Sequence, residues 1–244
     1  MMHAISVKNV DKEFKIYKDT RRSLKDKLLL FSKNRYEVRK VLKNISFNIK
    51  PGEAVGIIGK NGCGKSTLLK LLCKIMYPSK GIVSTSGRVA SLIELGAGFH
   101  PDMTGRENIY INASIFGLTT KEIEKKMDSI IGFSELEDYI DEPIRIYSSG
   151  MYMRLAFSVA INVDADILLI DEILAVGDIT FQEKCFKKLR DIKSNGTTIV
   201  IVSHSLGQIE AFCDRSIWIK DGKIYMDDKP DLVNRKYEEF MLRG

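Results

Sequence analysis

The sequence predicts an α/β protein in which a mainly parallel sheet is interrupted by a helical block. Three apolar stretches of strand length, at Ala54–Ile58, 167–170 and Thr198–Val202, have the composition of strands buried on both faces. Helical patterns dominate residues 101–164, which separate the first of these strands from the other two. Because strands that alternate with helices form parallel sheets, the 244 residues indicate one domain with an inserted helical subdomain.

Two further strands are predicted near the start of the chain. Residues 4–10 have a strand-like pattern, and apolar residues alternate with polar ones over 41–49. Within the inserted block, the clearest helical patterns cover 121–131 and 151–163.

A basic segment lies between the first two predicted strands. Residues 15–43 contain eleven Lys or Arg and three Asp or Glu, while the whole chain has a net charge of +6. Leu24, Leu28 and Phe31 recur there at helical spacing, which predicts a short amphipathic helix. The segment suggests an anionic partner or the headgroup side of a membrane, and the alternative is a solvated surface loop.

The composition, 44% hydrophobic and 29% charged, is typical of a folded soluble protein. No apolar run is long enough for a membrane helix, and the N-terminus lacks the layout of a signal peptide, so we expect a cytoplasmic chain. The four cysteines form no CxxC pair, which favours ordinary reduced thiols.

The strand Ala54–Ile58 leads into a glycine-rich segment that matches the GxxxxGK[ST] phosphate loop. Lys65 would contact the β- and γ-phosphates of a nucleoside triphosphate, and Ser66 would ligate Mg²⁺. Cys63 lies near Lys65 and a predicted helix N-terminus, which predicts a thiolate whose alkylation inhibits the enzyme and from which bound nucleotide protects it. The nucleotide-binding residues expected here are Gly59, Asn61, Gly62, Cys63, Gly64, Lys65, Ser66 and Thr67.

Two carboxylates follow the apolar strand at 167–170. Asp171 is placed to organise Mg²⁺ and its waters, and Glu172 is placed as the base that activates the attacking water. A second polar motif, whose Ser149 lies 22 residues before Asp171, precedes a predicted helix, where backbone N–H groups can face an anion. By itself such a motif is typical of a helix N-cap. It reads Tyr147-Ser148-Ser149-Gly150-Met151.

Taken in order, these motifs resemble those of the ABC ATPases over the whole chain. The phosphate loop, signature motif, acidic strand end, D-loop and switch histidine would lie at 59–67, 147–151, 167–172, 175–178 and His204. The resemblance implies a P-loop NTPase fold of the ABC-ATPase type, with a RecA-like core, an N-terminal antiparallel β-subdomain and an inserted α-helical subdomain. The implied parts are a nucleotide-binding core at 1–98 and 165–228, a helical subdomain at 99–164 and a C-terminal helix at 229–244.

The same resemblance implies a homodimer whose two copies pack head to tail around two ATP molecules. Each ATP would contact the phosphate loop of one copy and Ser149 and Gly150 of the other. Lys65, Glu172 and His204 would form the catalytic set, with His204 sensing the γ-phosphate. ATP and Mg²⁺ are the implied cofactors.

Two positions fit the family less closely. Family members stack adenine on an early aromatic residue, for which Phe14 fits best and Tyr17 second, while a core aromatic is the alternative. No glutamine follows the phosphate-loop helix where the family has one that contacts Mg²⁺ and the membrane partner. Glu94 is the candidate substitute, because a carboxylate can ligate Mg²⁺.

The segments at 94–109 and 171–178 and the YSSGM signature resemble the ATPases that export O-antigen, capsule and teichoic-acid polymers, the O-antigen type most fully. This implies a permease dimer as partner, a lipid-linked polysaccharide handled by that permease, no nucleic acid, and a peripheral position on the cytoplasmic face of the inner membrane. No C-terminal carbohydrate-binding domain is expected. Residues 99–107 are the candidate permease contact, and Leu24, Leu28 and Phe31 would add a second.

Three alternative functions fit the sequence less well. A soluble ABC ATPase acting on nucleic acid or ribosomes usually has two cassettes or a long coiled-coil insertion, and neither is visible in the sequence. An importer or drug exporter is disfavoured by the missing glutamine and the Ser-Ser-Gly signature. A non-catalytic module is disfavoured by the presence of Lys65, Glu172 and His204.

Overall fold

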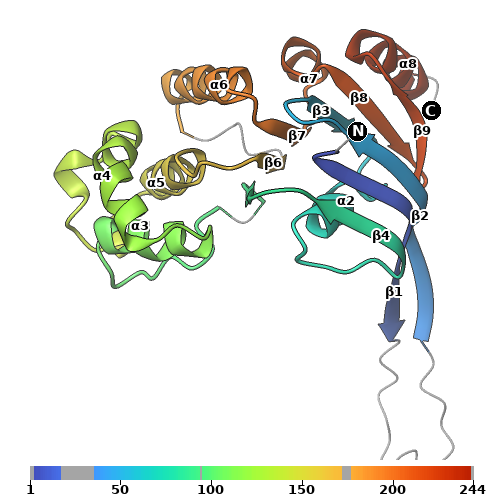
Figure 1. Cartoon of the computed structure of the whole chain (residues 1–244). Helices are drawn as coiled ribbons and strands as arrows, with labels where there is room; N and C mark the ends of the chain where they lie inside the picture. The colour runs from blue at the N-terminus through green and yellow to red at the C-terminus, as the bar shows by residue number, and fades with distance from the viewer. Residues whose placement is uncertain (1–2, 18–35, 94, 172–176, 243–244) are drawn as a thin grey trace, which may run out of the picture.

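The computed structural model describes residues 3–17, 36–93, 95–171 and 177–242. Two sheets and their covering helices lie on one side, and a lobe built around α3, α4 and α5 lies on the other (Figure 1). The strands are β1 (Ile5–Tyr17), β2 (Tyr36–Ile49), β3 (Ala54–Ile58), β4 (Lys80–Thr85), β5 (Val89–Ser91), β6 (Ile167–Asp171), β7 (Thr198–Val202), β8 (Arg215–Lys220) and β9 (Lys223–Asp228). The helices are α2 (Lys65–Leu72), α3 (Gly105–Ile115), α4 (Thr120–Ser134), α5 (Ser149–Ile161), α6 (Ile179–Ser194), α7 (Leu206–Phe212) and α8 (Pro230–Leu242), with 3₁₀ turns η1 (Glu137–Tyr139) and η2 (Ile144–Ile146).

The larger sheet has the strand order β5-β6-β7-β3-β8-β9 and is parallel except for the edge strand β9. All residues of β3 and β7 are buried, and alternate residues of each strand enter two different hydrophobic clusters. Both faces of the sheet are therefore covered, as the continuous apolar runs predicted. Because β6, β7 and β3 are parallel neighbours, their carboxyl ends lie at one edge of the sheet.

The smaller sheet is antiparallel, with the order β2-β1-β4. The β1–β2 pairing runs from Ile5 opposite Ile49 to Tyr17 opposite Tyr36, so both strands are longer than the sequence predicted. The added residues are largely half-buried or exposed and polar, which explains why apolar alternation did not reveal them. The apolar face of this sheet packs with α2 and the larger sheet in one core cluster.

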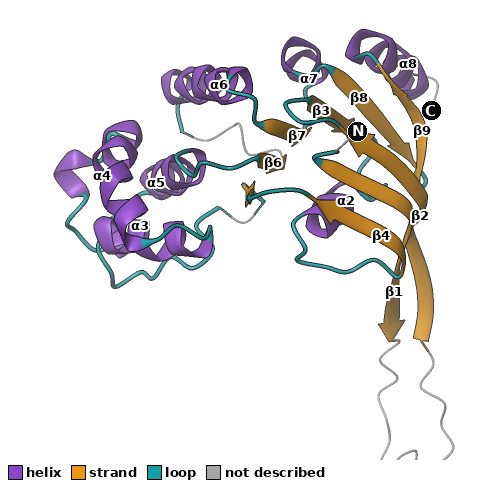
Figure 2. Ribbon diagram, in the orientation of Figure 1, coloured by secondary structure: helices purple, strands orange, loops and turns teal. Residues whose placement is uncertain are grey.

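The helical lobe is stabilised by well-formed helix starts and its own apolar core. Thr104 and Glu107 form a capping box at α3, and Thr119 and Glu122 form one at α4. Such boxes satisfy N–H groups that have no partner within the helix. Figure 2 shows these helices gathered beside α5. The buried side chains of the lobe include Ile109, Ile123, Ile130, Leu155 and Phe157.

Helices α6, α7 and α8 complete the larger-sheet side. Trp218 of β8 has its ring centroid 5.3 Å from that of Tyr237 and 5.3 Å from that of Phe240, both in α8. These contacts fix α8 beside the sheet. Within the part of the chain that the structure describes, no helix combines the length and apolarity needed to cross a membrane.

The observed architecture confirms the predicted fold class: a mainly parallel sheet, an antiparallel N-terminal sheet and an inserted helical lobe. The helices predicted at 121–131 and 151–163 correspond to α4 and α5. The short helix predicted from Leu24, Leu28 and Phe31 lies outside the described residues.

Candidate functional site

The glycine-rich segment forms a tight loop between β3 and α2. Gly59, Gly62 and Gly64 have φ angles of 151°, 77° and 113°, which side chains rarely allow. A Cβ at Gly59 would collide with the carbonyl oxygen of Ile219, and one at Gly64 would lie 2.6 Å from a methyl carbon of Leu42. Backbone conformation thus favours glycine at all three positions, and close packing against β8 and β2 adds a second requirement at Gly59 and Gly64.

Lys65 is the first residue of α2 and is only 5% exposed. Its Nζ donates to the carbonyl oxygens of Gly59 at 2.8 Å and Lys60 at 3.4 Å, so the ammonium group lies against the beginning of the loop. The N-cap of α2 is Gly64, which offers no side-chain cap to the first N–H groups. An uncapped helix start beside a buried ammonium group is suited to bind a polyphosphate.

Ser66 and Thr67 lie in the first turn of α2, where Ser66 is exposed and Thr67 is half-buried. Their hydroxyl groups are hard oxygen donors of the kind that Mg²⁺ accepts. Asn61 and Gly62 are exposed at the crest of the loop.

Cys63 does not have the predicted environment. It is 8% exposed, and burial, the largest effect, raises the pKa of its thiol, although Lys65 and backbone N–H groups oppose the shift. The prediction of a favoured thiolate is therefore wrong: desolvation of the charged form outweighs the nearby positive charge.

Asp171 and His204 lie near the same edge of the large sheet as the phosphate loop. Asp171 is the last residue of β6 and is half-buried, and His204 follows β7 by two positions and is exposed. β7 pairs with β6 on one side and with β3 on the other. Parallel pairing thus brings together Asp171, His204 and the loop that follows β3. Glu172 lies outside the described residues.

The motif YSSGM begins helix α5. Ser148 is its N-cap and accepts a hydrogen bond from the Met151 N–H at 3.2 Å, while Ser149 and Gly150 form the first turn. A Cβ at Gly150 would meet only the Ser148 hydroxyl within 4 Å, at 3.8 Å. Packing within the chain therefore does not require glycine at this position. The absence of a side chain does leave the backbone N–H groups at the helix start accessible to a ligand. The Tyr147 hydroxyl donates to the Tyr139 carbonyl at 2.7 Å and anchors the motif.

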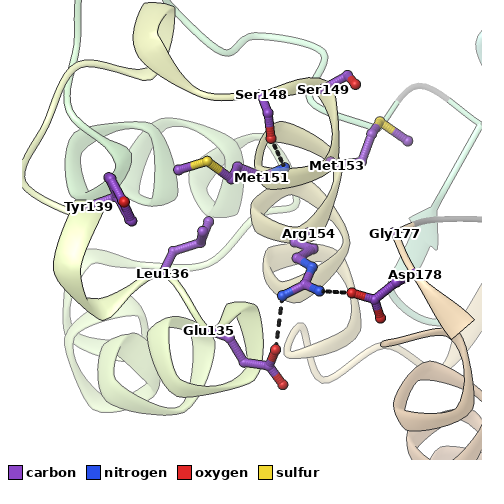
Figure 3. A pocket seen from close by; sticks show the side chains of 11 residues that line it. Glu135, Leu136, Tyr139, Ser148, Ser149, Met151, Met153, Arg154, Gly177 and Asp178 are labelled. Atoms are coloured by element: carbon purple, nitrogen blue, oxygen red, sulfur yellow. Dashed lines mark hydrogen bonds and ion pairs between the residues drawn. The ribbon is translucent and has the colours of Figure 1, made fainter. Parts of the chain in front are cut away.

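A pocket of about 700 Å³ opens beside this helix start (Figure 3). Arg154, one turn further along α5, donates to Asp178 at 2.6 Å and to Glu135 at 2.9 Å. The pocket therefore joins the start of α5, the end of α4 and the start of α6. Its lining residues are Glu135, Leu136, Tyr139, Ser148, Ser149, Gly150, Met151, Met153, Arg154, Gly177 and Asp178.

The two aromatic candidates on β1 differ in position. Phe14 is half-buried and pairs across the sheet with Arg39, which lines a basic pocket of about 410 Å³ together with the phosphate-loop residues 60–63. Tyr17 is 62% exposed, at the far end of β1 opposite Tyr36. This arrangement favours Phe14 as the aromatic residue nearer the loop.

The stretch that follows β5 is held against the helical lobe by hydrogen bonds from a buried asparagine and a half-buried tyrosine. Asn108 is fully buried; its Oδ1 accepts from the His100 N–H at 2.6 Å and its Nδ2 donates to the Thr104 carbonyl at 2.8 Å. The Tyr152 hydroxyl donates to the Gly96 carbonyl at 3.0 Å. Residues 96–104 are thereby fixed to α3 and α5. Glu94, the candidate Mg²⁺ ligand, lies outside the described residues.

Three polar residues of this region were not singled out as site residues by the sequence: Asn108, Tyr152 and Arg154. Arg154 lies inside the helix predicted at 151–163, where polar residues usually face solvent, and Asn108 lies in α3, which was not predicted separately from the sequence. The available signal was weak. Asn108 and Tyr152 lie within or next to the segments that carry the family resemblance, and Arg154 follows Gly150 at a spacing of four, on the same helix face.

The comparisons with known proteins agree with this geometry. The family model described as "ABC transporter" matches residues 42–175, more than half of the chain. The chain belongs to the ABC transporter family. The matched range includes the phosphate loop, the start of α5 and the acidic end of β6.

Relatives within this family are similar over almost the whole chain. The O-antigen export system ATP-binding protein RfbB of Klebsiella pneumoniae is 47% identical over 99% of this chain and 100% of its own length. RfbB of Myxococcus xanthus is 49% identical over 98% of this chain and 56% of its own length. The teichoic acids export ATP-binding protein TagH of Listeria monocytogenes is 41% identical over 97% of this chain and 70% of its own length.

Solved structures confirm the fold of the family. An ATP-binding subunit of an ABC transporter matches 96% of this chain and 93% of its own, with a TM-score of 0.76 and 21% identity. An ATP-binding cassette solved as a dimer in a post-hydrolysis state, bound to ADP and Pi, matches 93% of this chain and 98% of its own, with a TM-score of 0.73 and 24% identity.

Proposed function

We propose that this chain is the ATP-hydrolysing subunit of an ABC transporter that exports a lipid-linked polysaccharide, of the O-antigen type, across the cytoplasmic membrane. One observation carries the proposal: 47% identity with an O-antigen export ATP-binding protein across the full length of that relative. The phosphate loop holds buried Lys65 against its own backbone, and Asp171 ends β6 while His204 follows the neighbouring strand β7; this arrangement supports hydrolysis rather than a purely structural role.

Hydrolysis would use groups from three neighbouring strand ends. Lys65 and the N-terminus of α2 would hold the β- and γ-phosphates, and Ser66 and Asp171 would hold Mg²⁺, which neutralises charge on the phosphate oxygens. Glu172 would accept a proton from water as the water oxygen attacks the γ-phosphorus and ADP leaves. His204 would contact the γ-phosphate oxygens. Glu94 is a further proposed Mg²⁺ ligand.

A second copy would complete each nucleotide site. Ser149 and Gly150 begin α5 with open backbone, a geometry suited to phosphate oxygens approaching from outside the chain. In a head-to-tail homodimer they would contact the ATP held by the partner's phosphate loop. The adenine would stack on Phe14, whose cross-strand neighbour Arg39 lines the basic pocket beside the loop.

Coupling to a permease would pass through the helical lobe. The proposed division is a nucleotide-binding core at 1–98 and 165–228, a helical subdomain at 99–164 and a C-terminal helix at 229–244. Residues 99–107 are the proposed permease contact, because buried Asn108 fixes that stretch rigidly to α3. The subunit would then sit peripherally on the cytoplasmic face of the inner membrane, and the permease dimer would handle the polymer.

The decisive experiment replaces Glu172 with Gln, which keeps the shape of the side chain and removes the base. We expect lipid-linked polysaccharide to accumulate in the cytoplasm and to disappear from the cell surface. Normal surface glycans together with failing translation or repair would retain the ATPase and reject export, in favour of an ABC ATPase that acts on nucleic acid or ribosomes.

A further inference from the structure

The basic pocket beside the phosphate loop carries positive charge that the proposed function leaves unused. Its volume is about 410 Å³, and its walls come from β2, the phosphate loop, the end of β8 and α8. Five cationic side chains line it, against one carboxylate, that of Asp221. A cavity of this size and charge suits an anion larger than a simple inorganic ion. The cations are Arg39, Lys40, Lys43, Lys60 and Lys220.

Most of this charge is not neutralised within the chain. Lys40 pairs with Glu13 at 3.0 Å. In the ranges that the structure describes, none of the other four cations lies within ion-pair distance of a carboxylate. The pocket therefore offers several charged donors to an anion from outside the chain.

The ring of Phe240 in α8 holds two of the cations together. Nζ of Lys60 lies 4.7 Å from the ring centroid, and Nζ of Lys220 lies 4.1 Å from it. Attraction to the ring orients each ammonium group, but the ring has no net charge and cannot neutralise either of them. Like charges that share one ring repel each other, and an anion bound between them would remove this repulsion.

The walls of the pocket are held in place by backbone contacts. The Lys43 N–H donates to the Gly222 carbonyl at 2.8 Å, which connects β2 to the turn between β8 and β9. A Cβ at Gly222 would lie 2.4 Å from the carbonyl oxygen of Val41, so glycine permits this close approach. On the other wall, the Lys60 carbonyl accepts from the Cys63 N–H at 3.2 Å. The cations thus project from backbone whose position is fixed.

This pocket and the start of α2 lie on different sides of the phosphate loop. Helix α2 packs in the core cluster on one face of the large sheet, and α8 packs beside Trp218 in the cluster on the other face. Because the Lys60 ammonium group lies over a ring of α8, its side chain leaves the loop on the α8 side. Lys65 instead begins α2, with its ammonium group against the loop backbone. An anion held by Lys60 is therefore distinct from phosphates held by Lys65.

The charged hollow continues past the turn between β8 and β9. A neighbouring pocket of about 410 Å³ shares Lys43, Lys220 and Asp221 with the first and adds Lys223 and Tyr225. The Tyr225 ring lies 5.0 Å from Nζ of Lys220. A second group of donors next to the first fits closely spaced phosphate groups better than a single phosphate.

We propose that the basic pocket is a second anion-binding site, which takes a ligand with two or more closely spaced phosphate groups while a nucleotide occupies the phosphate loop. A free diphosphate compound and a surface of phospholipid headgroups both present such groups, and the test separates these two sources. The site goes beyond the proposed function, because binding here requires neither hydrolysis nor export.

The test measures binding of inorganic pyrophosphate to the full-length chain by isothermal titration calorimetry, without added Mg²⁺ and with saturating ADP to fill the nucleotide site. Lys220→Met keeps an aliphatic stem over Phe240 and removes the charge, Lys43→Met removes a cation from β2, and Lys220→Arg keeps the charge. Lys121→Met is the matched control, because Lys121 is an exposed lysine of α4, outside both pockets.

We expect about one pyrophosphate to bind per ADP-saturated chain, and each of Lys220→Met and Lys43→Met to weaken this binding about tenfold, because a charged contact with phosphate is lost. Lys220→Arg and Lys121→Met should stay within about threefold of the wild type. The two Met variants are independent, so the test remains valid if one of them fails to fold.

Cosedimentation with phosphatidylglycerol vesicles tests the lipid source, with phosphatidylcholine vesicles as the control of no net charge. If the ADP-saturated chain binds no pyrophosphate, but Lys220→Met and Lys43→Met bind phosphatidylglycerol vesicles about tenfold more weakly than Lys121→Met does, the site is assigned to lipid headgroups.

The inference is overturned if neither pyrophosphate nor phosphatidylglycerol binds the ADP-saturated chain. It is also overturned if loss of Lys43 or Lys220 weakens neither binding more than loss of Lys121 does, since the anion then binds elsewhere. A chain that binds an anion here but exports no polysaccharide would reject the proposed function and retain this site.

Discussion

Replacing buried Asn108 should destabilise the helical lobe far more than replacing an exposed asparagine. The Asn108 Oδ1 accepts from the His100 N–H at 2.6 Å. Its Nδ2 donates to the carbonyl oxygens of His100 at 3.1 Å, Met103 at 3.1 Å and Thr104 at 2.8 Å. The side-chain amide of Asn108 therefore connects the loop before α3 to the helix by hydrogen bonds, and this side chain is fully buried.

The magnitude follows from the bonds lost. With two amide hydrogens and one acceptor in use, Asn108→Ala removes about three hydrogen bonds at about 1 kcal/mol each. The estimate for the free energy of unfolding is thus a loss of about 3 kcal/mol, or a fall in Tm of about 6–12 °C for a chain of this size. Asn108→Asp should cost at least as much at neutral pH, because it places a carboxylate against three carbonyl oxygens.

Urea unfolding followed by circular dichroism measures the change, with Asn195→Ala as the control, since Asn195 is exposed at the end of α6. The control should lie within about 0.5 kcal/mol of the wild type. Our reasoning fails if Asn108→Asp is as stable as the wild type. In cells, Asn108→Ala should reduce export more than it reduces the ATPase activity of the isolated chain, because residues 99–107 are the proposed permease contact.

Three further predictions concern ionisation and the surroundings of the phosphate loop. A hydrogen bond from Lys184 is the largest effect that lowers the pKa of Glu135 below its ordinary value of 4.5. A carboxyl group whose pKa is lower in the folded state stabilises the fold above pH 4.5, and this stabilisation is lost as the pH falls through the folded-state pKa. Glu135→Gln should therefore reduce the difference in the free energy of unfolding between pH 6 and pH 3, as measured by urea titration. Phe240 of α8 lies 4.7 Å beneath Nζ of Lys60, in the phosphate loop. Phe240→Ala should therefore raise the KM for ATP a few-fold with little change in kcat, and an unchanged KM would contradict this. Burial raises the pKa of the Cys63 thiol, so iodoacetamide at pH 7.5 should alkylate it more slowly than a free thiol, and ATP should slow the reaction further; rapid alkylation of the folded chain would refute the assignment.

The sequence by itself determined the local motifs, in which the relevant residues are neighbours along the chain. The phosphate loop requires glycines, Lys65 and Ser66 within one short turn, and the acidic strand end requires Asp171 directly after an apolar run. Both patterns depend on local backbone conformation, and the parallel arrangement of the main sheet followed from the alternation of strand and helix, whereas the strand order comes from the structure. The structure places the loop, Asp171 and His204 where those patterns predicted.

The tertiary structure alone decided the contacts between distant segments. Arg154 and Asp178 are 24 residues apart, and Tyr152 and Gly96 are 56 residues apart, so no local pattern relates them. Packing of α5 against α6 and against the stretch after β5 brings them together. Cys63 shows the same limit for electrostatics. Its neighbours in sequence predicted a thiolate, but its burial in the core cluster shared by the two sheets and α2 is a property of the packed chain. Desolvation depends on everything that surrounds a group, and the sequence supplies only what precedes and follows it.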